Sequence, residues 1–242
     1  ERRPLEEARL RLAEEDGDVV RKLAGRPILR PVDGGLELRA MIGSKAANLA
    51  EVDRLLGAGA VPEWFVVTDA ALNELLDSPV GGDGPTLRMA IEGVLAQTET
   101  SHAQKSFLIR KLWEGTRLPA SLEGDLIAAY RRLGGPETPS ANGPAEEPYV
   151  AVRSSGSEED LEESSRAGEF ATFLFVRGAD SLIRSLKSAW AGLWTERAIH
   201  NRAVLGLGAA GAGGGLIVQR VVRSRVAGVL QTGYAGTTPA AA

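Results

Sequence analysis

The stretch Tyr149-Val150-Ala151-Val152-Arg153, followed by Ser154-Ser-Gly-Ser-Glu-Glu-Asp160, decides how this sequence is interpreted. The residues before the arginine predict a short strand that runs into a polar loop. Arginine offers a two-pronged donor for phosphate oxygens, and the hydroxyl and backbone N–H groups of the loop add further donors. If the stretch is taken alone, an ion pair between Arg153 and the acidic residues 158–163 is the favoured interpretation.

Around this strand the pattern of apolar residues predicts a mixed α and β protein. A helix is expected to open at Gly43-Ser44-Lys45 and to end at Gly57. A lysine one turn into such a helix is usually solvated, so Lys45 alone indicates little. The other expected strands are 61–68, 171–176, 216–222 and 228–232, and the other expected helices are 69–76, 86–97, 103–114, 120–133 and 180–194.

The composition is that of an ordinary globular protein, with 242 residues, 43% of them hydrophobic, and a net charge of −4. The absence of cysteine excludes disulfides, thiolate zinc sites and cysteine nucleophiles. Only two histidines are present, so a histidine-rich metal site is excluded as well. Any divalent ion would bind to oxygen atoms, which favours Mg²⁺.

Charge and hydropathy further limit the partners of the chain. Residues 181–242 carry seven basic residues and one acidic residue, a local charge of +6 that suits an anionic ligand. Nucleic-acid binding is not expected, because the net charge is negative and no platform of aromatic and basic residues is present. No apolar run approaches the ~20 residues of a membrane helix, and residues 1–7 do not resemble a signal sequence, so a cytoplasmic location is expected. We also expect the chain to be a fragment, because it lacks an initiator Met and its last residues show no packing pattern.

Three further motifs have ordinary structural interpretations. Residues 206–211 satisfy G-x-G-x-x-G but follow a helix and precede a strand, so we interpret them as a linker. His200 is expected to be a surface or packing residue near the end of a helix. The acidic residues 158–163 could bind Mg²⁺, but a solvated helix start is the favoured interpretation.

Four blocks of the sequence together resemble a known family. They are Gly43-Ser-Lys-Ala-Ala-Asn-Leu49, Val61-Pro-Glu-Trp-Phe-Val-Val-Thr68, Val150-Ala-Val-Arg-Ser-Ser155 with Glu159-Asp-Leu161, Ala167-Gly168 and Thr172-Phe-Leu174, and Val218-Gln-Arg-Val-Val222 with Gly228-Val-Leu-Gln-Thr232. This series resembles the N-terminal ATP-grasp domain of the phosphoenolpyruvate synthase and pyruvate phosphate dikinase family. Rifampicin phosphotransferase and glucan, water dikinase contain the same domain.

The resemblance implies a site for ATP and Mg²⁺. Lys45 and Arg153 would hold the ATP phosphates, and Gly168 and Thr172 would belong to a small lid loop above them. Gln219 would meet the adenine, helped by the backbone near Val221. The Mg²⁺ ligands of the family are expected beyond this chain.

The same family has a phosphohistidine motif that Thr100-Ser101-His102-Ala103 resembles. In the family the motif follows glycines and leads into an apolar helix, which is not the case here. We therefore predict that Ser101 or Thr100 caps a helix at this position.

The resemblance also implies an organisation into domains. Residues 1–38 are expected to form a helical or extended leader. Residues 39–215 would form the first ATP-grasp subdomain, with a helical insert at about 70–133 and a linker at 134–148. Residues 216–242 would begin the second subdomain.

The function implied is the ATP-binding part of a phosphoenolpyruvate synthase-like phosphotransferase, inactive as a fragment. ATP would be held for phosphoryl transfer to a histidine on another domain, and a further domain would bind the acceptor. The alternative is a non-catalytic nucleotide-binding regulatory or scaffold module, because Trp64 and Ser44 stand where the family has glycine and Glu169-Phe170 where it often has glutamines. A partner-binding helical module is a third interpretation, based on residues 1–38 and the basic C-terminal part.

Overall fold

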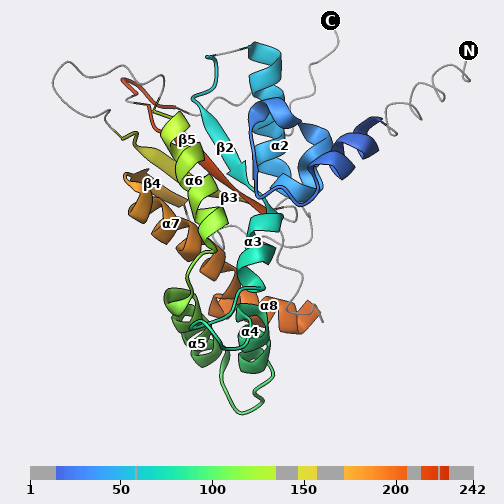
Figure 1. The fold of residues 1–242 in the computed structure, drawn as a ribbon, viewed down its shortest axis with the longest axis vertical. Coiled ribbons are helices and arrows are strands. Elements are labelled where there is room, and N and C mark those ends of the chain that lie inside the picture. Colours follow the sequence, from blue (N-terminus) through green and yellow to red (C-terminus); the bar gives the residue numbers. More distant parts are fainter. Residues whose placement is uncertain are drawn as a thin grey trace, which may run out of the picture.

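The computed structural model describes residues 15–57, 59–134, 147–156, 172–205, 214–222 and 224–228. These residues form one antiparallel sheet with helices on both faces, so the expected mixed α and β class is confirmed (Figure 1). The order of the strands in the sheet is β1-β2-β5-β3-β4. Their bounds are Ile28–Leu29 for β1, Trp64–Val67 for β2, Val150–Gly156 for β3, Thr172–Val176 for β4 and Gly214–Arg220 for β5.

The helices largely follow the sequence prediction. Residues 15–23 are helical, and the labelled helices are α2 (Arg39–Leu56), α3 (Asp69–Leu76), α4 (Leu87–Leu95), α5 (His102–Gly115), α6 (Ala120–Arg132), α7 (Ala179–Ala191) and α8 (Glu196–Leu205). The helix expected at 180–194 instead ends at Ala191, and Gly192–Trp194 forms a separate 3₁₀ turn. Trp194 is nevertheless buried, with its ring centroid 5.6 Å from that of Trp113.

The two faces of the sheet contribute to two different cores, because successive side chains of a strand point to opposite faces. One face carries residues such as Val152, Leu216 and Val218, which belong to the larger core formed with α3 to α8. The other face carries Trp64, Val66 and Ile217, which pack against α2. The sheet therefore lies between α2 and the layer that contains α6 and α7, while α4, α5 and α8 gather beyond its end (Figure 1).

Strand β5 is central to the sheet, because it pairs with β2 on one side and with β3 on the other. The predicted boundary at residue 215 falls inside this strand, and residues 216–220 pair with β2 and β3 in the same sheet. The expected strand at 228–232 lies almost entirely outside the described residues. The linker interpretation of residues 206–211 concerns residues that are likewise not described.

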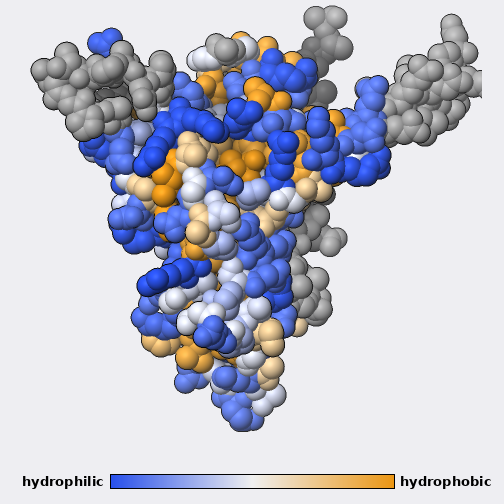
Figure 2. Space-filling view, in the orientation of Figure 1, coloured by the Kyte–Doolittle hydropathy of each residue, from blue (hydrophilic) through white to orange (hydrophobic). Residues whose placement is uncertain are grey.

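The surface in the orientation of Figure 2 is largely hydrophilic, with apolar residues gathered mainly in its upper part. Among the helices that the structure describes, none has the length and hydropathy needed to cross a bilayer.

Candidate functional site

Arg153 lies on β3, on the face of the sheet that α2 covers. In the two strand pairings it stands opposite Ile217 of β5 and Thr172 of β4. Directly opposed residues of antiparallel strands point to the same face, and Ile217 belongs to the core beneath α2. Arg153 and Thr172 therefore project toward the α2 side.

The start of α2 touches the same strand two residues farther along. The helix is interrupted at Gly43, whose φ of 79° and ψ of 166° are not helical. A Cβ atom at Gly43 would lie 1.8 Å from the carbonyl oxygen of Ser155, so only glycine permits this approach. The backbone N–H of Ala46 then donates a buried 2.9 Å hydrogen bond to Ser155 Oγ.

These contacts place Lys45 and Arg153 on one face of the sheet, as the ATP hypothesis requires. Ser155 and Arg153 are two residues apart on a strand and so point to the same face, and Ser155 reaches the helical turn that contains Lys45. The Lys45 side chain is exposed. Sequence reasoning counted Ser155 as a donor for the ligand, but the structure shows it accepting a bond from α2, which no sequence pattern predicted.

Arg153 has few partners for a partly buried guanidinium. Its Nη2 group donates a 2.7 Å hydrogen bond to Gln219 Oε1, while its Nε atom is buried without a hydrogen-bond partner in the described part of the chain. No ion pair joins it to any of the described residues. The alternative interpretation, an ion pair between Arg153 and residues 158–163, concerns residues that the structure does not describe. A buried N–H that lacks an acceptor is costly, and a phosphate oxygen would satisfy it.

Gln219 and Val221 lie at and just beyond the end of β5. The Gln219 amide nitrogen donates to the carbonyl oxygen of Pro62 at 3.2 Å. The backbone N–H of Val221 donates to the carbonyl oxygen of Tyr149 at 2.8 Å. The N–H of Val221 is therefore already engaged, which leaves its carbonyl as the backbone group that could meet an adenine amino group.

Thr172 is exposed at the first residue of β4. Its position opposite Arg153 fits the expectation that it lies near the phosphates. Gly168, the other residue assigned to the lid, lies outside the described residues.

His102 and His200 come together in space although 98 positions separate them in the sequence. Their ring centroids lie 5.5 Å apart, in an edge-on arrangement between α5 and α8. Ser101 occupies the N-cap of α5 and forms a reciprocal capping box with Gln104, so the prediction of a capped helix start is confirmed.

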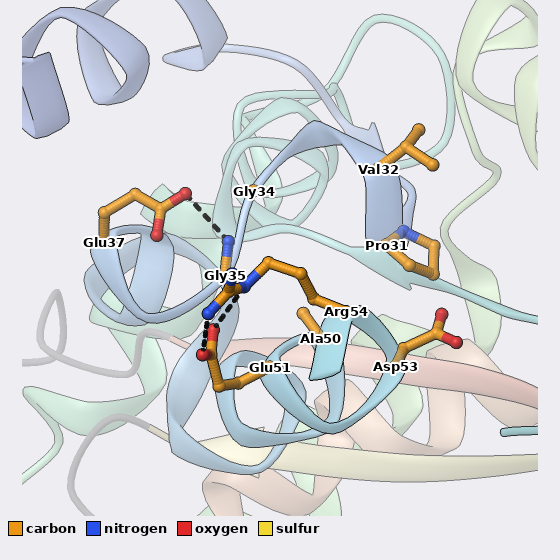
Figure 3. Close-up of a pocket in the computed structure, with 9 residues that line it drawn as sticks. All are labelled: Pro31, Val32, Gly34, Gly35, Glu37, Ala50, Glu51, Asp53 and Arg54. Atoms are coloured by element: carbon orange, nitrogen blue, oxygen red, sulfur yellow. Dashed lines mark hydrogen bonds and ion pairs between the residues drawn. The ribbon is translucent and has the colours of Figure 1, made fainter. Parts of the chain in front are cut away.

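Two concavities are lined by described residues, and neither includes Lys45 or Arg153. One, of about 360 Å³, lies between the segment 31–37 and the outer side of α2, where Glu51 binds Arg54 (Figure 3). The other, of about 550 Å³, lies between β4 and α7 and includes Thr172. Within the described ranges, no three or more His, Asp or Glu side chains are grouped to hold a metal ion.

Comparison with known proteins identifies the family of the chain. Residues 39–239 match the family described as "Pyruvate phosphate dikinase, AMP/ATP-binding domain". The chain is 36% identical over 197 residues to phosphoenolpyruvate synthase of Aeropyrum pernix, and 35% identical over 201 residues to that of Pseudomonas aeruginosa. It is 30% identical over 211 residues to rifampicin phosphotransferase of a Streptomyces species.

These alignments cover 81%, 81% and 87% of the chain. The chain spans less than a quarter of the length of each of these relatives, 23% in all three cases. The match to the family model begins at the first residue of α2 and includes β5. The protein therefore belongs to the family of the pyruvate phosphate dikinase AMP/ATP-binding domain.

Proposed function

We propose that this chain binds ATP as the nucleotide-binding part of a phosphoenolpyruvate synthase-like phosphotransferase. The observation that carries the proposal is the Arg153 guanidinium, on the face where the Lys45 turn begins, whose buried Nε has no acceptor among the residues that the structure describes. A polyphosphate would supply acceptors for Arg153 and opposite charge for both cations. The family match and the relatives named above support the same conclusion.

Each predicted site residue has a role in this proposal. Lys45 and Arg153 neutralise the phosphates, which is most of what phosphoryl transfer needs from the protein. Thr172 and Gly168 border the phosphates from the lid side. Gln219 and Val221 mark the end of β5 nearest the adenine.

Further components of the reaction lie beyond the described residues. We propose that Mg²⁺ accompanies ATP, bound by the phosphate oxygens and by oxygen ligands outside the described residues. A histidine on another domain would accept the phosphoryl group, and a further domain would hold the final acceptor. We also propose a cytoplasmic location, where ATP is abundant.

The test is ATP binding by the complete protein and by its Arg153→Ala variant, measured by isothermal titration. Loss of a charge-assisted hydrogen bond of ~1.5–3 kcal/mol corresponds to roughly 10- to 150-fold weaker binding. Arg88→Ala is the matched control, because Arg88 of α4 is bonded to Asp77 and Asn73 and should not affect ATP. Equal affinities of the wild type and Arg153→Ala would contradict the proposed site.

The products distinguish a transferase from the alternative regulatory module. A transferase releases AMP or ADP from ATP in the complete protein, whereas a regulatory module binds ATP and leaves it intact. If ATP neither binds nor raises the melting temperature, the partner-binding interpretation is favoured over both.

A further inference from the structure

Gln219 bridges two parts of the fold through its side-chain amide. Its oxygen accepts from Arg153 Nη2 at 2.7 Å, and its nitrogen donates to the carbonyl oxygen of Pro62 at 3.2 Å. A guanidinium can only donate and a carbonyl can only accept, so these two partners fix which end of the amide faces which way.

The Pro62 end of this bridge is held by the backbone. Glu63, the next residue, accepts a 2.9 Å hydrogen bond from the backbone N–H of Arg220, and the side chains of Glu63 and Arg220 pair at 3.1 Å. The residue before β2 is thereby attached to Arg220 at the end of β5, next to Gln219. The amide consequently has a fixed anchor from which to hold Arg153.

The same two hydrogen bonds engage both ends of the Gln219 amide, the groups that would pair with adenine. A two-point pairing between a glutamine and adenine uses the amide oxygen as acceptor and the amide nitrogen as donor. Here the oxygen is engaged by Arg153 and the nitrogen by Pro62, so pairing with the base would compete with both bonds.

Arg153, in contrast, needs an orienting partner. An arginine side chain loses much rotational freedom when it binds an anion, and a group that holds it beforehand reduces that loss. Gln219 is the side chain that bonds its guanidinium among the described residues, and Thr172 lies opposite it across the strand pair.

We infer that Gln219 is a positioning residue that orients the Arg153 guanidinium toward the polyphosphate of the ligand. Adenine recognition then falls to other groups. This inference rests on the proposed function, since it assumes that Arg153 binds phosphate.

The first test compares Gln219→Met with wild type, using ATP, inorganic tripolyphosphate and adenosine as separate ligands. Methionine keeps the length of the side chain and removes both hydrogen bonds. We expect the substitution to weaken the binding of ATP and of tripolyphosphate by the same factor, about 5- to 30-fold, and to leave the binding of adenosine unchanged. Gln97→Met, on an exposed glutamine, is the matched control.

A double-mutant cycle provides a readout that a merely structural role would not affect. Because Gln219 acts through Arg153, the double variant with Arg153→Ala should bind tripolyphosphate no more weakly than Arg153→Ala alone. The inference is wrong if the losses of tripolyphosphate affinity in the two single variants multiply in the double variant. It is also wrong if Gln219→Met weakens the binding of ATP and adenosine but not that of tripolyphosphate. If the wild type binds neither ATP nor tripolyphosphate, the proposed function fails, and the inference fails with it.

A second measurement needs no ligand. In nitrogen-15 spectra of the wild-type protein, the Arg153 side chain should show slow rotation and slow hydrogen exchange compared with the exposed Arg117. Gln219→Met, if folded, should bring both rates close to those of Arg117. Fast motion of Arg153 in the wild type would overturn the inference while leaving the ATP-binding result untouched.

Discussion

Gly43 and Ser155 are in direct backbone contact, since a Cβ atom on Gly43 would lie 1.8 Å from the carbonyl oxygen of Ser155. This contact joins the start of the α2 helix to the strand that carries Arg153. The two expected phosphate-binding cations thus belong to elements in contact, although 108 positions separate them in the sequence. Stability and ligand binding should both depend on this junction.

Gly43→Ala should destabilise the protein by more than ~3 kcal/mol, because a new methyl group would overlap fixed backbone and the φ of 79° is already strained for alanine. Urea denaturation measures the change. Gly57→Ala is the control, since Gly57 has a φ of 84° but nothing within 4 Å of a new Cβ. It should cost only ~1–2 kcal/mol, and equal costs at the two sites would show that the close approach does not matter.

Ser155→Ala should cost ~1–3 kcal/mol of stability, because the buried N–H of Ala46 loses its acceptor. The same variant should weaken ATP binding, since the turn that carries Lys45 is no longer held against β3. Ser78→Ala is a suitable control, as its hydroxyl makes an exposed bond to the Glu74 carbonyl. Unchanged unfolding and ATP affinity in Ser155→Ala would contradict this role.

Tyr130 should make the protein less stable at alkaline pH. Its hydroxyl donates to the Pro148 carbonyl and accepts from the Gly178 N–H, and burial raises the pKa of the phenol above its ordinary value. The unfolded state then loses its proton at a lower pH than the folded state, so this stability is complete below about pH 10 and falls as pH rises through the folded pKa. Tyr130→Phe should remove that part of the fall in urea titrations between pH 9 and 11, and Tyr149→Phe should not.

Lys187 should make the stability of the protein rise with pH, which is opposite to the effect of Tyr130. Its ammonium group donates to the carbonyl oxygens of Glu114 and Thr116, and burial lowers its pKa below the ordinary value for lysine. The unfolded state therefore binds more protons between the folded pKa and about pH 10.5, and this group makes stability rise with pH in that window. Lys187→Met should abolish the rise in the same titrations, with Lys111→Met as an exposed control. If the stability of Lys187→Met rises with pH as much as that of the wild type, the rise is caused by another group.

Ser101→Ala should lower stability by ~0.5–2 kcal/mol, because the capping box at the start of α5 is lost. Ser101→Asp should retain most of the stability, since aspartate also caps helices. Thermal denaturation measures both changes. ATP binding should be unaffected, because α5 packs in the helical region beyond the end of the sheet (Figure 1); a loss of ATP affinity would link His102 or its neighbours to the site.

Local sequence patterns were sufficient to predict most helices and strands. The apolar spacing of α5 and α6 and the apolar run of β2 are properties of neighbouring residues, so they can be recognised without knowledge of the fold. The helix expected through Trp194 was predicted too long, because tertiary packing buries Trp194 in a 3₁₀ turn although its spacing suits a helix. The boundary predicted at residue 215 falls inside β5, whose pairing with β2 and β3 a local pattern does not show.

The sequence by itself determined the residue types of the candidate site, a lysine in a glycine-led helix start and an arginine in a β3 strand, together with the family they resemble. Only the tertiary structure decided that Gly43 lies against Ser155, that Gln219 bonds Arg153, and that both cations share one face. The physical reason is that hydrogen bonds and backbone contacts between residues more than 60 positions apart depend on strand order and register. The strand order places β5 between β2 and β3, which brings these distant residues together.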